Sequence, residues 1–290
     1  MTPDLAGEGD GPRALRVDAH HHLWRLSRGD YGWLTPEVGA LYRDVEPSDF
    51  APHLARNGID RGVLIQAAPT VAETLFLCEL ARDNPFIAAV VGWIDFTDPA
   101  SRADLERLKQ LPPFRGVRPM IQDIAEDAWM LRPELNHTFR NLVALDLSFD
   151  ALVQPRHLPH LIELVARHPD LRLVINHCGK PEIRDWTPGD ADFRNWADGM
   201  AWLARNSGAF CKFSAMPTRA APGWTVETFR PYADALLGAF GPERLMWASD
   251  WPVLERNGTY DDWLAAAREL AGPAGADAVF GNTARQFYRF

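Results

Sequence analysis

The chain has little cysteine, with three residues in 290, at Cys78, Cys178 and Cys211. They are odd in number and far apart, and no two form a Cys-x-x-Cys pair. They therefore predict neither a disulfide framework nor a structural zinc site. Buried free thiols in a reducing compartment are the plain interpretation, and we expect a cytoplasmic protein.

Long apolar runs are also missing. No stretch approaches the roughly 18 uninterrupted apolar residues of a transmembrane helix, so no membrane span is expected. The N-terminus is rich in glycine, proline and acidic residues and lacks the apolar core of a signal peptide. We expect residues 1–14 to be a disordered lead-in and residues 15–290 to form one domain.

Positive charge is in deficit. The chain has 30 lysine and arginine residues against 39 acidic residues, which gives a net charge of −9. An acidic surface disfavours nucleic acid or an anionic membrane as a partner, because phosphate binding needs clustered positive charge. A small anionic substrate stays compatible with this composition, since a few arginines inside a cleft act locally.

Glycine-rich phosphate loops and internal repeats are absent as well. The chain instead alternates short apolar runs with longer amphipathic stretches. The apolar runs predict strands at residues 15–20, 62–67, 87–94, 115–120, 149–153, 171–176, 209–214 and 244–248. The amphipathic stretches predict helices that include residues 72–83, 101–111, 158–167, 193–205 and 226–240. Eight strands alternating with helices indicate a parallel (β/α)8 TIM barrel. An open doubly wound sheet is the competing fold, which the lack of a phosphate loop disfavours.

Polar residues stand where several of these strands end, and in a parallel barrel such ends converge on one mouth. The first strand ends in the run that contains Asp18, His20, His21 and His22. Strand alternation predicts Asp18, His20 and His22 on one face and His21 on the other. Two histidines at i and i+2 can bind one metal or one anion together. A surface cluster of histidines is the alternative, and the position directly after an apolar strand disfavours it.

Two later strands end in similar residues. His177 follows the sixth strand, before a Gly-Lys-Pro turn, and Asp250 closes the eighth strand. A lone histidine is most often a satisfied core residue, but an aspartate after an apolar strand is costly to bury without a partner or a task. The ordered set of His20, His22, His177 and Asp250 therefore predicts one cluster at the barrel mouth.

Several segments resemble the amidohydrolase-2 family, and within it the sugar-lactonase branch of L-fuconolactonase, L-rhamnonolactonase and sulfomuconolactonase-like enzymes. These segments are residues 18–24, 31–34, 41–44, 115–118, 177–181 and 248–252, and the resemblance extends over nearly all of 17–290. It implies a hydrolase that opens the ester ring of a sugar aldonolactone or a muconolactone, with Asp250 as general base on water.

The resemblance also bears on metal. It implies that His20, His22 and His177, together with Asp250, either hold one divalent ion such as zinc or polarise the lactone carbonyl directly. The fifth strand ends in Gln154 instead of histidine, and the fourth offers no lysine to carboxylate, so a two-metal site is disfavoured. No metal and one metal both stay open at this point.

We further expect a substrate-binding set around this cluster. The guanidinium of Arg118 is suited to donate two hydrogen bonds at once to a carboxylate or to hydroxyls. The aromatic residues are suited to pack against the apolar face of a sugar. The set comprises Arg118, Gln154, Lys180, Trp24, Tyr31 and Trp251. A metal-dependent decarboxylase of the same family and a ligand-binding barrel without catalysis are the alternatives. The partner is a small lactone, and a homodimer is compatible with the sequence.

Overall fold

The computed structural model describes residues 14–290, so the segment predicted as a disordered lead-in lies outside the described residues, except for its last residue. Eight parallel strands form one sheet in chain order. They are β1 (Val17–His21), β2 (Arg61–Ile65), β3 (Ile87–Gly92), β4 (Phe114–Val117), β5 (Ser148–Ala151), β6 (Leu173–Ile175), β7 (Phe210–Phe213) and β8 (Leu245–Trp247). All eight predicted strands are present, and each is shorter than its apolar run.

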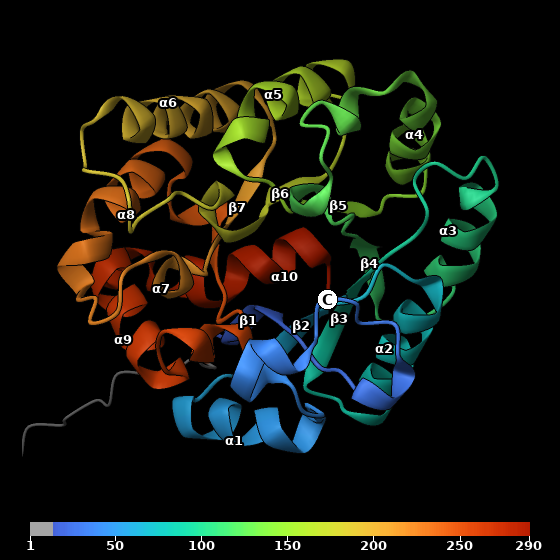
Figure 1. Ribbon diagram of the computed structural model, residues 1–290, viewed down its shortest axis with the longest axis horizontal. Helices are drawn as coiled ribbons and strands as arrows, with labels where there is room; N and C mark the ends of the chain where they lie inside the picture. The colour runs from blue at the N-terminus through green and yellow to red at the C-terminus, as the bar shows by residue number, and fades with distance from the viewer. Residues whose placement is uncertain (1–13) are drawn as a thin grey trace, which may run out of the picture.

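Helices cover the outside of this sheet as a ring (Figure 1). The α-helices are α1 (Pro47–Asn57), α2 (Val71–Asp83), α3 (Ser101–Lys109), α4 (Asn136–Ala144), α5 (Leu158–Arg167), α6 (Ala191–Asn206), α7 (Met216–Arg219), α8 (Val226–Phe240), α9 (Tyr260–Ala271) and α10 (Thr283–Tyr288). The five predicted helices correspond to α2, α3, α5, α6 and α8. None of the described helices is long and apolar enough to cross a membrane.

The sheet closes between β1 and the segment that follows β8. The backbone N–H of His22 donates to the carbonyl of Trp251 at 2.8 Å, and the N–H of Asp250 donates to the carbonyl of His20 at 2.9 Å. These bonds bring the two outer strands together and confirm the predicted (β/α)8 barrel over an open sheet. They also hold two of the predicted site segments side by side.

The last helix, α10, closes the bottom of the barrel and lies within the ring of outer helices in Figure 1. Its residues Phe287 and Tyr288 are buried against apolar side chains such as Val17 of β1. The approach is close at Gly281, where an added Cβ would stand 2.0 Å from the carbonyl oxygen of Leu15. This end of the barrel is therefore filled. Barrels of this fold carry their active sites at the opposite end, where the C-terminal ends of the strands lie.

Candidate active site

A β-bulge in β1 determines which side chains enter the barrel. The register against β2 shifts between Asp18 and His21. As a result His20 turns into the barrel, while Asp18 lies on the outer face and accepts hydrogen bonds from the Tyr260 hydroxyl at 3.1 Å and the Ser249 N–H at 2.9 Å. The prediction that Asp18 shares a face with His20 was wrong, because the extra residue of a bulge breaks strict alternation. His21 faces away from the barrel, as expected, and stacks on Phe50.

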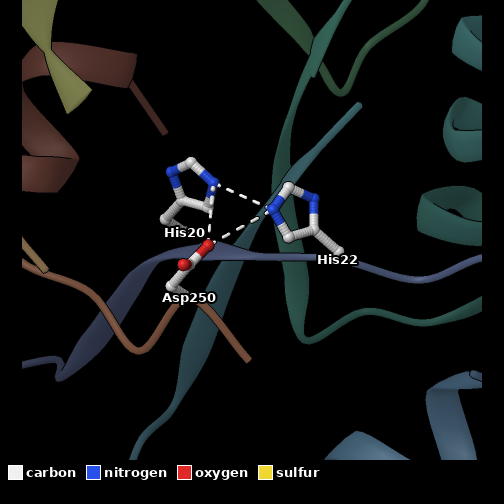
Figure 2. A group of neighbouring side chains, drawn as sticks. All are labelled: His20, His22 and Asp250. Atoms are coloured by element: carbon white, nitrogen blue, oxygen red, sulfur yellow. Dashed lines mark hydrogen bonds and ion pairs between the residues drawn. The ribbon is translucent and has the colours of Figure 1, made fainter. Parts of the chain in front are cut away.

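The four predicted catalytic residues meet at the barrel mouth. Three imidazole nitrogens surround one oxygen, Oδ1 of Asp250, with Nε2 of His22 at 3.4 Å, His20 at 3.6 Å and His177 at 3.7 Å. Figure 2 shows His20, His22 and Asp250 pointing toward one another from two chain segments. All four side chains are buried. The sequence therefore placed this cluster correctly in space, while the catalytic role of its members stays a prediction.

Two of these side chains are aimed by an uncommon backbone conformation. His177 has a φ of 54° and Asp250 a φ of 60°, both in the left-handed region that residues other than glycine rarely occupy. Each such residue costs on the order of 1–3 kcal/mol, and such residues concentrate at functional sites. In both cases the turn directs the side chain from the end of a strand toward the centre of the mouth.

The remaining ring nitrogen of each histidine has its own partner. Nδ1 of His22 donates to the carbonyl of Ile65 at 2.9 Å, and Nδ1 of His177 lies 2.9 Å from Oγ of Ser214. Nδ1 of His20 lies 3.3 Å from Nζ of Lys212. Hydrogen bonds of this kind fix ring orientation, so that every Nε2 faces Asp250.

The cluster combines an ionised carboxylate with neutral imidazoles, because the pKa values of all these groups are lowered. Burial raises the pKa of Asp250, but His177, His22 and Lys180 together outweigh it and bring this pKa to about 2. Burial is the main cause that lowers the pKa of His20 and His177 well below the ordinary value, and it also lowers that of His22. At neutral pH the site thus presents an ionised aspartate beside uncharged imidazoles.

A cavity of about 260 Å³ opens above the cluster. Its lining contains five of the predicted site residues, namely His22, His177, Asp250, Arg118 and Lys180, and does not include His20. It also contains residues that were not predicted: Trp33, Ala67, Met120, Gln122, Asp123, Leu152, Val253 and Arg256. These come from loops after the strands, where no sequence pattern shows the direction of a side chain.

Two cations of this lining are held by neighbours. Arg118 donates through Nη2 to the carbonyl of Gln66, and its Nη1 lies 3.4 Å from Nε2 of His20. Lys180 donates through Nζ to Oε1 of Gln122. Burial lowers the pKa of Lys180 to about 8, even though Asp250 acts to raise it. Both residues therefore present positive charge to the cavity at neutral pH.

The other predicted binders lie outside the described lining of this cavity. Trp24 is buried and donates to the carbonyl of Arg43 at 2.7 Å, and Trp251 stacks on Phe50. Tyr31 is also buried. Gln154 precedes the 3₁₀ turn Pro155–His157, where its side-chain oxygen accepts from Arg156. Three of the four residues thus have partners among neighbouring residues, and a substrate-binding role for all four stays a prediction.

Three donors of the cluster have the spacing of a metal site. A side-chain nitrogen of His20, one of His22 and a carboxylate oxygen of Asp250 all lie within 4.8 Å of one another. Their separations are 3.1, 3.4 and 3.6 Å. Ligands at about 2.0–2.2 Å from a tetrahedral ion stand about 3.3–3.6 Å apart, so this donor set fits one zinc ion.

A comparison with known protein families identifies the family of this chain. A family model described as amidohydrolase matches residues 17–290. The chain belongs to the amidohydrolase family. The resemblance predicted from the motifs is therefore confirmed over almost the whole chain.

Named relatives of this amidohydrolase include two proteins called L-fucono-1,5-lactonase. One, from Burkholderia ambifaria, is 40% identical over 95% of this chain and 96% of its own length. The other, from Burkholderia multivorans, is 35% identical over 95% of this chain and 96% of its own length. Both fall within the sugar-lactonase branch that the sequence resembles.

A solved amidohydrolase from Burkholderia multivorans with bound zinc has the same fold. It is 33% identical, with a TM-score of 0.88 over 96% of this chain and 100% of that chain. Solved 5-carboxyvanillate decarboxylases are more distant, at 15% and 18% identity with TM-scores of 0.69 and 0.66. At that identity the likeness shows the fold alone.

A buried ion pair below the cluster was missed from the sequence. Lys212 of β7 and Asp150 of β5 are fully buried, with Nζ 2.8 Å from Oδ2. Each of these two charged residues lies inside a predicted apolar strand. A buried charge needs a partner, so their positions were a weak indication that they pair. Their strands are not neighbours in the chain, so only the closed barrel reveals the pairing.

Proposed function

We propose that this amidohydrolase is a lactonase that opens the ester ring of a sugar 1,5-lactone by attack of water. One observation carries the proposal: an ionised Asp250 lies within 3.4–3.7 Å of three imidazole nitrogens beside a polar cavity. Two relatives named L-fucono-1,5-lactonase, at 40% and 35% identity, support the substrate class.

Asp250 is the general base of the proposed reaction. Its carboxylate takes one proton from water as the water oxygen attacks the lactone carbonyl carbon. When the tetrahedral intermediate collapses, the ring C–O bond breaks and the same proton returns to the leaving alkoxide. Water and lactone thereby give one hydroxy acid, and the carboxylate is regenerated. A pKa of about 2 keeps Asp250 in its basic form over the whole neutral range.

Negative charge that develops on the carbonyl oxygen needs fixed donors nearby. Arg118 in the cavity lining supplies N–H donors, and Lys180 adds a second positive charge. A divalent ion held by His20, His22 and Asp250 would polarise the same carbonyl when bound. His177 would then contact substrate or water instead of completing the ligand set.

The cavity lining suits a ligand rich in hydroxyl groups. Gln122, Asp123, Lys180 and Arg256 line it, and they offer both donors and acceptors. Trp33 provides an apolar face beside them, with its indole N–H bound to the carbonyl of Ala67 at 2.8 Å. A polyhydroxylated ring with one face of C–H groups matches this mixture better than an aromatic acid does.

A pH-indicator assay over a panel of aldono-1,5-lactones and muconolactones tests the proposal. A lactonase releases acid as its product ionises, whereas the decarboxylase alternative releases carbon dioxide and requires stoichiometric metal. We expect acid release above the spontaneous rate with L-fucono-1,5-lactone. Carbon dioxide release from aromatic acids, with no lactone opened, would replace the proposal with the decarboxylase.

The requirement for metal is tested on the same substrate. Protein stripped with a chelator and checked by elemental analysis is assayed with and without added zinc. Full activity of the metal-free protein would exclude an obligatory ion, and a loss restored by zinc would establish one. A cytoplasmic location and a homodimer stay predictions, which cell fractionation and light scattering address.

A further inference from the structure

Glu73 is a buried carboxyl group that the proposed reaction does not use. It is the third residue of α2, and its side chain is fully buried. It does not line the cavity above the catalytic cluster. Burying a carboxyl group is costly unless hydrogen bonds compensate, so its partners indicate what this residue does.

The partners of Glu73 are two consecutive backbone N–H groups that precede its helix. Oε1 accepts from the N–H of Ala67 at 2.9 Å, and Oε2 accepts from the N–H groups of Ala67 and Ala68 at 3.1 and 3.0 Å. A glutamate at this helix position ordinarily accepts from the N–H of the N-cap residue. Here the N-cap is Thr70, whose N–H donates to the carbonyl of Ala68 at 2.9 Å. Glu73 therefore holds the segment that follows β2 instead of the start of its own helix.

These two bonds fix the direction of two backbone carbonyls. A trans peptide group is planar, so its C=O and its N–H point in opposite directions. The N–H of Ala67 shares a peptide group with the carbonyl of Gln66, which accepts from Nη2 of Arg118. The N–H of Ala68 shares the next peptide group with the carbonyl of Ala67, which accepts from the indole N–H of Trp33 at 2.8 Å. One carboxyl group thus sets the acceptors of two side chains.

Both of these side chains line the catalytic cavity, and they have few other polar contacts. In the part of the chain that the structure describes, the guanidinium of Arg118 makes its one bond to an oxygen at Gln66, and its Nε has no partner. The indole of Trp33 is otherwise held by an edge contact with Trp24, with the ring centroids 5.3 Å apart. The carbonyls of the segment are therefore the main polar anchors of both groups.

The contacts of Glu73 do not depend on its charge. Burial raises the pKa of this carboxyl group to about 8. Oε2 alone accepts from both N–H groups, so a neutral carboxyl group that keeps this oxygen as its carbonyl holds the segment as an ionised one does.

We propose that Glu73 is a positioning residue: through two adjoining peptide groups it fixes the guanidinium of Arg118 beside the lactone carbonyl and the indole of Trp33 against the sugar ring. The parts about the carbonyl and the ring rest on the proposed function. The positions of the two side chains do not.

Two substitutions separate the acceptor from the rest of the side chain. Glu73→Met removes both acceptor oxygens at similar length, and we expect kcat/KM of the folded protein to fall by about 10- to 100-fold. The loss should appear in both kcat and KM, because Arg118 acts on the carbonyl oxygen and Trp33 on the ring. Glu73→Gln keeps one oxygen that can accept from both N–H groups, so kcat/KM should stay within about threefold of wild type.

The position of Trp33 is measured without any substrate. ¹H–¹⁵N correlation NMR resolves the indole N–H groups of the tryptophans, and the signal of Trp33 is assigned from its loss in Trp33→Phe. In Glu73→Met we expect this signal to shift and its proton to exchange faster with water. In Glu73→Gln the signal should stay in place.

Thr74→Val is the matched control on the same helix. Thr74 is also buried, and its hydroxyl accepts from the N–H of Trp93 at 2.7 Å, away from the segment that Glu73 holds. We expect this nearly isosteric change to lower the unfolding temperature while the Trp33 signal and kcat/KM stay unchanged. If Glu73→Met does not fold, Glu73→Asp replaces it. Its carboxyl group is one methylene shorter and cannot reach both N–H groups, so we expect smaller changes of the same kind.

An unmoved Trp33 signal and unchanged kcat/KM in folded Glu73→Met, or in Glu73→Asp in its place, would overturn the positioning role. A shifted signal with unaltered kinetics would refute the part that concerns the lactone. The two proposals fail separately. A protein whose Trp33 signal responds as expected but that opens no lactone refutes the proposed function, whereas an active lactonase whose signal does not respond refutes the role of Glu73.

Discussion

Replacing Asp250 by asparagine removes the proposed base with little change in shape. Asparagine is nearly isosteric with aspartate, and it is among the residues that best tolerate the left-handed backbone found here at φ 60°. We therefore expect the variant to fold with its backbone bonds to His20 and Leu254 intact. The change abolishes the carboxylate that three imidazole nitrogens surround at 3.4–3.7 Å.

The expected loss follows from the role of a base. General base catalysis contributes about 10²–10⁴-fold, or about 3–5.5 kcal/mol of transition-state stabilisation. We expect a fall in kcat near the upper end of this range, because the carboxylate is fully ionised at neutral pH and sits at the centre of the cluster. The assay is indicator-monitored hydrolysis of L-fucono-1,5-lactone, corrected for the spontaneous reaction.

A matched control separates the base from the general effect of losing an acid. Asp123 lines the same cavity, and its carboxylate contacts the Gln122 amide at 3.4 Å instead of an imidazole. We expect Asp123→Asn to change kcat much less than Asp250→Asn, with its main effect on KM. A folded Asp250→Asn variant that hydrolyses the lactone at the wild-type rate would refute the reasoning.

Three further predictions concern charge, orientation and packing. Because burial lowers the pKa of Lys180 to about 8, its ammonium is lost as the pH rises through that value, so kcat/KM should decline above about pH 8 and the decline should be absent in Lys180→Gln. Ser214→Ala removes the partner of Nδ1 on His177, and we expect about a 10-fold lower kcat with unchanged thermal stability, measured by steady-state kinetics beside thermal unfolding. Gly281→Ala places a Cβ 2.0 Å from the carbonyl of Leu15, and we expect a loss of about 2 kcal/mol in the free energy of unfolding, measured by urea titration. A flat pH profile in the wild type would contradict the role of Lys180. Unchanged kinetics in Ser214→Ala would contradict the orienting contact to His177, and unchanged stability in Gly281→Ala would contradict the close approach to Leu15.

The fold was predictable because each strand of a barrel is a short apolar run between turns, a pattern that is local in sequence. Five α-helices were not predicted, namely α1, α4, α7, α9 and α10, and two of them were hidden for local reasons. In α1 the stretch Pro47–Asn57 contains two prolines, which mimic a loop, and α10 is six residues long and has no amphipathic period to detect. The helix α9 was not identified, although Thr259 caps it and its buried face includes Trp263.

The candidate site was also predictable in part: residues at strand ends were found, and residues placed by loops or by contacts across the barrel were not. His20, His22, His177 and Asp250 were found because the ends of parallel strands must converge, a rule that needs no side-chain detail. The orientation of Asp18 was predicted wrongly, since a bulge leaves no mark in the sequence. The lining residues and the Lys212 pair depend on loop paths and on contacts across the closed barrel, which a single sequence does not reveal.

The central claim is that the groups at positions 20, 22, 177 and 250 surround the carbonyl of a bound lactone. A crystal structure of the Asp250→Asn variant soaked with L-fucono-1,5-lactone measures this directly. The account predicts an intact lactone in the cavity, with its carbonyl oxygen within hydrogen-bond distance of His20 and its carbonyl carbon beside position 250. A lactone bound with its carbonyl turned away from these residues would contradict the account.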